Sequence, residues 1–130
     1  MMKVRSGHII FDKKVSYRTL AKHFPELIKL FLEKSKQLEE EKEFLELIIK
    51  TNMADLIRNR KPEGYNKNAK MRLMFPIVDK RPIVMYIYRP VKSEDVVDVT
   101  NEISKFLKKK RIKHKVEWDK MLMFERKRRG

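Results

Sequence analysis

The densest run of chemically active side chains in this sequence is cationic and lies at residues 105–115. Seven of these eleven positions are basic and none is acidic; the basic residues are Lys105, Lys108, Lys109, Lys110, Arg111, Lys113 and Lys115. Like charges at this density repel one another, and a phosphate backbone relieves the repulsion while it releases its own counterions. The run therefore predicts contact with a polyanion, and nucleic acid is the polyanion that we expect.

A second cationic group consists of Arg126, Lys127, Arg128 and Arg129. The guanidinium fork matches phosphate geometry and stacks on bases, which favours nucleic-acid contact for this group. Charged chain ends are also common as solubilising segments, and this alternative stays open.

Two tyrosines in an apolar segment form the third candidate. Tyr86 and Tyr88 are two positions apart, so in a strand both rings project from one face of the sheet, with Arg89 next to them. Aromatic rings on an open sheet stack unpaired bases, although aromatic pairs also serve as ordinary strand packing. We therefore expect single strands or RNA to be favoured if the rings are exposed, and duplex binding through the backbone if they are buried.

Catalytic signatures are missing from the sequence. It has no cysteine, and its three histidines are too far apart to suggest a zinc site. Three scattered glycines offer no phosphate-binding loop. We expect no catalytic residue, no metal and no cofactor. A small metal-independent ribonuclease remains an alternative, because sites built from Lys, Arg, Tyr and His leave no spacing signature.

Composition limits the class of protein. A net charge of +15 on 130 residues, with 42% hydrophobic content, suits a single basic domain with one core. No apolar run approaches the ~20 residues of a membrane span, so we expect a soluble, cytoplasmic protein that does not contact membranes. Charge enrichment without cysteine is typical of thermophile proteins, and we expect an archaeal or viral source.

The helical part is expected at about residues 16–60. Ser16 suits a helix N-cap, and Pro25 suits the first turn of a second helix. Apolar residues then recur at spacings of three, four and seven as far as Leu56. The charged stretch at residues 33–43 leaves two arrangements open, one long helix or a helical hairpin. Either would supply an apolar surface for a homodimer.

The sheet-and-helix part is expected at about residues 70–125. Residues 71–78 and 83–88 predict a β-hairpin, Pro90 ends the second strand, and Ser93 caps a helix. Residues 115–118 and 121–124 predict a second hairpin, whereas residues 8–11 suggest only an isolated strand. The fold class is therefore α+β, with the helical part followed by an antiparallel ββαββ or ββαβ unit.

Together these features predict a non-enzymatic protein that grips nucleic-acid phosphates, with DNA or RNA undetermined. The charge is uneven, because residues 26–50 hold five lysines against seven glutamates. This asymmetry suggests helices that pack or dimerise and a separate surface that meets the polyanion. The competing interpretation is a protein interaction module or inhibitor that docks on an acidic protein partner.

Overall fold

A four-stranded antiparallel sheet with the strand order β2-β3-β1-β4 organises the fold. The computed structural model describes residues 2–76 and 81–120. Its elements are β1 (Val4–Phe11), α1 (Tyr17–Ala21), α2 (Phe24–Lys34), α3 (Leu38–Glu41), the 3₁₀ turn η1 (Lys42–Phe44), α4 (Leu45–Ile57), β2 (Arg72–Met74), β3 (Val84–Ser93), α5 (Glu94–Lys109) and β4 (His114–Trp118). Helices α1 to α4 fill the first crossover and α5 fills the second, which is the split βαβ connectivity.

The predicted element order was wrong, because a strand precedes the helices. Residues 8–11 belong to β1, which pairs with β3 on one side and β4 on the other. Its side chains are buried on both faces of the sheet, so the strand does not show the alternation of a half-buried strand. Ser6 and His8 are buried together with Ile9 and Phe11, so polar and apolar types are mixed along the strand.

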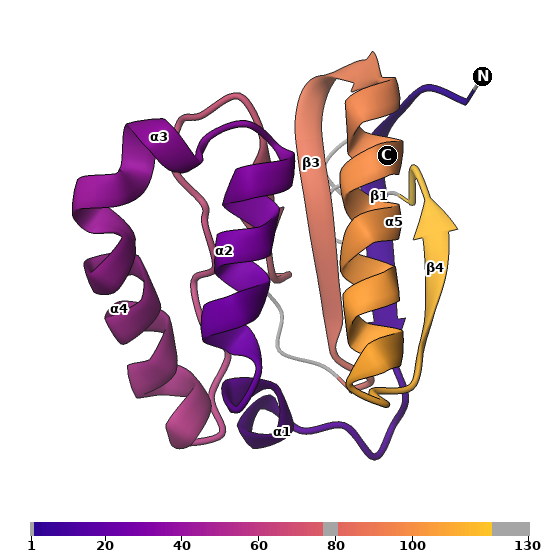
Figure 1. Ribbon diagram of the computed structural model, residues 1–130. Coiled ribbons are helices and arrows are strands. Elements are labelled where there is room, and N and C mark those ends of the chain that lie inside the picture. Colours follow the sequence, from indigo (N-terminus) through magenta and orange to yellow (C-terminus); the bar gives the residue numbers. More distant parts are fainter. Residues whose placement is uncertain (1, 77–80, 121–130) are drawn as a thin grey trace, which may run out of the picture.

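Helix α5 covers one face of the sheet, with α2 beside it and α4 outermost (Figure 1). Gly7 of β1 faces α5, and a Cβ at this position would overlap the side chain of Thr100. Glycine is therefore needed at this close contact between strand and helix. The opposite side of the sheet, here called the helix-free face, is covered by none of the described helices. It carries Ser6, His8, Ile10, Arg72, Met74, Val84, Tyr86, Tyr88, Lys115 and Glu117.

Ser16 caps α1 through a capping box with Thr19, and Pro25 lies in the first turn of α2, both as predicted. The long apolar stretch that follows forms a bent set of helices and not one rod. Helix α2 ends at Lys34, and Lys36 takes a left-handed backbone with φ 61°. The amide of Gln37 then donates to the carbonyl of Leu32 at 2.7 Å, which closes the helix end.

Buried polar side chains fix the helices to the irregular segment before β2. The Gln37 side chain bonds the backbone of Met71 twice, at 3.1 and 3.2 Å. Asn52 bonds the backbone of Gly64 twice, at 2.6 and 3.0 Å. These amides satisfy backbone groups that no strand pairs, so they hold the connection in place without regular secondary structure.

The first predicted hairpin is present as β2 and β3, but Pro90 does not end β3, which continues to Ser93. The register of β1 and β3 shifts between Ser6 and Val4, and Pro90 lies on β3 opposite that irregularity. A proline is tolerated there because no ladder hydrogen bond needs its missing N–H. Of the second predicted hairpin, β4 pairs with β1, while residues 121–124 lie outside the described residues.

Among residues 2–76 and 81–120, no helix has the length and apolar content that crossing a bilayer requires.

Candidate nucleic-acid interface

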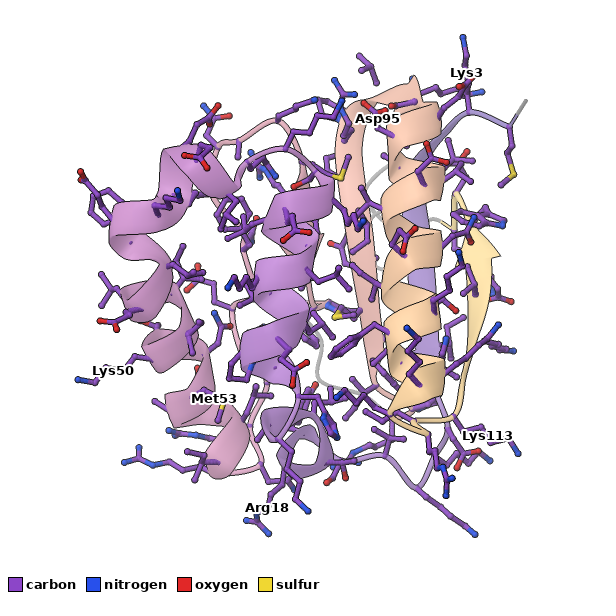
Figure 2. The ribbon with its side chains drawn as sticks, viewed as in Figure 1. Lys3, Arg18, Lys50, Met53, Asp95 and Lys113 are labelled. Atoms are coloured by element: carbon purple, nitrogen blue, oxygen red, sulfur yellow. The ribbon has the colours of Figure 1, made fainter. Side chains whose placement is uncertain are left out.

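Cations from three chain segments meet at one end of the sheet. Figure 2 shows Lys113 at this end and Asp95, in the first turn of α5, at the other. We call this surface the basic end and define it as Lys13, Lys14, Lys109, Lys110, Arg111, Lys113 and Lys115. All of these side chains are exposed except Lys110, which is partly buried.

The C-terminus of α5 is shaped so that its cations point outward. Arg111 takes a left-handed backbone with φ 60°, and its amide donates to the carbonyl of Lys108 at 3.0 Å. The amide of Ile112 donates to the carbonyl of Leu107 at 3.0 Å, and the Ile112 side chain is buried. This Schellman motif turns the chain sharply and anchors it by one apolar residue, which leaves the flanking cations in solvent.

The loop between β1 and α1 adds two lysines that were not predicted to belong to the interface. The amide of Asp12 donates to the carbonyl of Lys113 at 3.0 Å, which places Lys13 and Lys14 beside the start of β4. These lysines directly follow β1 in the sequence. Lys13 and Lys14 are about a hundred positions from Lys113 in the sequence. No sequence signal showed that β1 pairs with β4, so the sequence did not predict that these lysines lie together.

Few acids neutralise the basic end. Lys110 lies 3.7 Å from Glu26 and Lys115 lies 4.0 Å from Glu117, and both are loose pairs at the surface. Among the described residues, the other five cations of the basic end form no ion pair within 4.0 Å. Exposed pairs contribute little stability, so this surface retains a strong positive potential.

Two of the lysines predicted to contact phosphate lie close to acidic residues. Lys105 and Lys108 line a surface groove of about 450 Å³ together with Asp98 and Glu102 of α5. The neighbouring carboxylates reduce the local positive potential. These two lysines are therefore weaker candidates for phosphate contact than the basic end.

Comparison of the chain with protein-family models, with curated proteins and with solved structures gave no match.

Tyr86 and Tyr88 both lie on the helix-free face, as their spacing predicted, but they differ in burial. Tyr86 is only 7% exposed, and its ring stacks on His8 with 5.2 Å between centroids and 9° between planes. Tyr88 is partly exposed and lies in one cross-strand row with Arg72 and Ser6. The buried Tyr86 ring is thus engaged within the protein, which removes it from the surface for base stacking.

Arg89 is not brought to the basic end. Its Nη1 donates to Ser93 Oγ at 3.1 Å and lies 3.4 Å from Asp95 Oδ2. It therefore binds the N-terminal turn of α5, at the opposite end of that helix from Lys109. The other predicted cations, Arg126, Lys127, Arg128 and Arg129, lie outside the described residues.

The histidines are separated by the fold, and two of them make structural contacts. His114 Nε2 lies 2.7 Å from Ser104 Oγ, and its Nδ1 lies 2.8 Å from the carbonyl oxygen of Ile112. His8 Nε2 lies 2.8 Å from Ser6 Oγ, and burial lowers the pKa of His8 to about 4. Within the described part of the chain, no three His, Asp or Glu side chains are grouped so that they could hold a metal ion.

Proposed function

We propose that this protein binds nucleic acid by gripping backbone phosphates at the basic end. The observation that carries the proposal is the convergence of seven cations from the β1–α1 loop, the end of α5 and the start of β4, with only two loose ion pairs among them in the described part of the chain. A phosphate polymer offers many negative charges to such a surface, and the release of its counterions adds a favourable entropy.

Phosphate contact, and not stacking on the two tyrosines, is the basis of binding in this proposal. Tyr86 is held against His8, and Arg89 is held by Ser93 and Asp95. The groups that the basic end offers to an anion are the ammonium groups of its lysines and the guanidinium group of Arg111. Binding of this kind depends steeply on salt and weakly on sequence.

The test compares two triple variants with the same change in net charge. The first, K109Q/R111Q/K113Q, removes three cations from the basic end. The control, K29Q/K34Q/K50Q, removes three exposed cations from α2 and α4, where Figure 2 shows Lys50 on the far side of the molecule. Fluorescence anisotropy with duplex and single-stranded DNA and RNA of equal length is recorded over a series of salt concentrations.

The slope of log K against log salt should become shallower by about 0.9 for each phosphate that is no longer neutralised, so by roughly 2 to 3 for the first variant. The control should retain the slope of the original protein. Equal reductions in both variants would mean that net charge alone drives binding, and absence of binding by the original protein at moderate salt would refute the proposal.

An acidic protein partner is the competing occupant of the same surface. Affinity for nucleic acid should rise with oligonucleotide length, because a longer strand offers more overlapping sites. A shaped acidic protein would not be displaced progressively better by longer oligonucleotides. The length series therefore separates the two partners with one measurement.

A further inference from the structure

A groove opens at the basic end, where the end of β1 meets the start of β4. It has a volume of about 310 Å³ and is lined by Ile10, Phe11, Asp12, Lys13, Pro82, Lys113, His114 and Lys115. Pairing places Ile10 opposite Lys115 on one side and Val84 on the other. Because Ile10 and Lys115 belong to the helix-free face, the groove lies at the edge of that face.

The lining combines an apolar wall with cations. Ile10 and Pro82 are partly exposed and provide the apolar surface, whereas the Phe11 side chain is buried behind them, and lysines come from both flanking loops. Among the described residues, one acid lines the groove, Asp12, and its Oδ2 accepts a hydrogen bond from the backbone amide of Lys14 at 3.2 Å. The groove therefore offers apolar contact to a flat ring and positive charge to an anion attached to it.

We propose that this groove takes one unpaired nucleotide, with the base against Ile10 and Pro82 and the phosphate toward the lysines. This inference rests on the proposed function and deepens it by naming the form of nucleic acid. The volume is at the small end of the range for ligand pockets, about 300 to 1,000 Å³, which fits one nucleotide better than a base stack.

The bases of duplex DNA cannot contact the apolar wall of such a groove. Their faces are stacked on one another, so an apolar wall meets only the sugar-phosphate backbone. A base in a single strand or at a frayed end presents its face and gains from apolar contact. The seven cations of the basic end attract both forms, and the groove adds affinity only for the unpaired one.

The first arm of the test uses the original protein, so it needs no variant to fold. Fluorescence anisotropy compares a single-stranded DNA with a blunt duplex that has the same number of phosphates. We expect the single strand to bind roughly fivefold more tightly, which is the low end of the gain from one base stacked on a side chain. Equal affinities would overturn the inference while leaving the proposed function intact, and no binding of either probe would refute the proposed function itself.

The second arm replaces the apolar wall without changing charge. Ile10→Gln puts an amide in the groove, and Val84→Gln is the matched control, since Val84 is the cross-strand neighbour of Ile10 but does not line the groove. Ile10→Gln should remove most of the preference for the single strand and leave the duplex affinity within about twofold of the original. Val84→Gln should keep the preference. A preference unchanged in Ile10→Gln would overturn the inference.

Discussion

His8 is a side chain whose protonation in mild acid is changed by the fold. It lies in the centre of the sheet between Tyr86 on β3 and Glu117 on β4, and it is 2% exposed. Burial lowers its pKa from 6.5 to about 4, against the opposing effect of Asp119 and Glu117. At neutral pH the ring is therefore uncharged, and the hydrogen bond with Ser6 and the stack on Tyr86 are made by neutral imidazole.

This shift predicts a loss of stability in mild acid. The unfolded chain protonates His8 below pH 6.5, whereas the folded protein does so only near pH 4. The unfolded state therefore binds more protons between these values, and the free energy of unfolding falls as the pH is lowered through this window. The loss attributable to His8 is at most about 3 kcal/mol. Urea denaturation at a series of pH values measures it.

Carboxylates also titrate near the lower end of this pH window, so their contribution must be separated from that of His8. The comparison protein for this purpose is His8→Gln. Its amide is polar but does not titrate, and its free energy of unfolding should depend less on pH between 6.5 and 4. Identical pH profiles for the two proteins would show that His8 is not held neutral by the fold.

At the scale of elements, three helices end on left-handed residues that are not glycine. Lys36 follows α2, Asn59 follows α4 and Arg111 follows α5, with φ of 61°, 57° and 60°. Each is closed by the same pair of Schellman hydrogen bonds. A residue with a Cβ is less stable in this conformation than glycine by about 1 kcal/mol. The sequence therefore tolerates local strain at its helix ends.

Arg111 is both one of these strained residues and a member of the basic end. Replacing it by glycine should raise the free energy of unfolding by about 1 kcal/mol, because the left-handed backbone is then unstrained. The same change should weaken nucleic-acid binding and reduce the salt slope by about 0.9, because one fewer phosphate is neutralised. Thermal unfolding and anisotropy on one preparation measure both effects.

Lys36→Gly is the control for this prediction. It relieves the same strain at the end of α2, where Gln37 follows, and it lies outside the basic end. It should stabilise the protein equally and leave binding unchanged. A variant of Arg111 that binds as tightly as the original protein would remove this residue from the interface.

At the scale of the whole molecule, the most pronounced feature is the uneven distribution of charge. Five glutamates lie at residues 39–46, around α3 and the start of α4. At the basic end, five of the seven cations form no ion pair with a described residue. One of these glutamates, Glu41, is also neutralised within the fold. Burial alone would raise the pKa of Glu41, but hydrogen bonds from Lys67 and Tyr65 outweigh it and leave that pKa below its ordinary value.

Added salt should therefore stabilise this protein. Raising the ionic strength from about 0.01 to 0.15 M shortens the screening length from ~30 to ~8 Å, which weakens repulsion at the basic end more than it weakens the few exposed ion pairs. The melting temperature in sodium chloride should rise, and by less in K109Q/R111Q/K113Q than in K29Q/K34Q/K50Q. A melting temperature that falls with salt would show that attractive pairs outweigh the repulsion.

Local features of the chain were predictable because they depend on neighbouring residues. Ser16 as a cap, Pro25 in the first turn of α2, Ser93 as the cap of α5 and the hairpin of β2 and β3 all follow from rules that span a few positions. The break after α2 did not follow from such rules, because Lys36 takes the left-handed backbone that glycine usually marks in a sequence.

The sequence by itself determined that the chain is strongly basic, that it folds as α+β, and that its cations concentrate after residue 104. The tertiary structure alone decided that β1 lies inside the sheet between β3 and β4, and these two pairings have several consequences. They bring Lys13 and Lys14 to Lys113, bury His8 against Tyr86, and form the groove beside Ile10. Strand pairing joins residues about a hundred positions apart through backbone hydrogen bonds, which are the same for every residue type, so side-chain patterns carry little information about them.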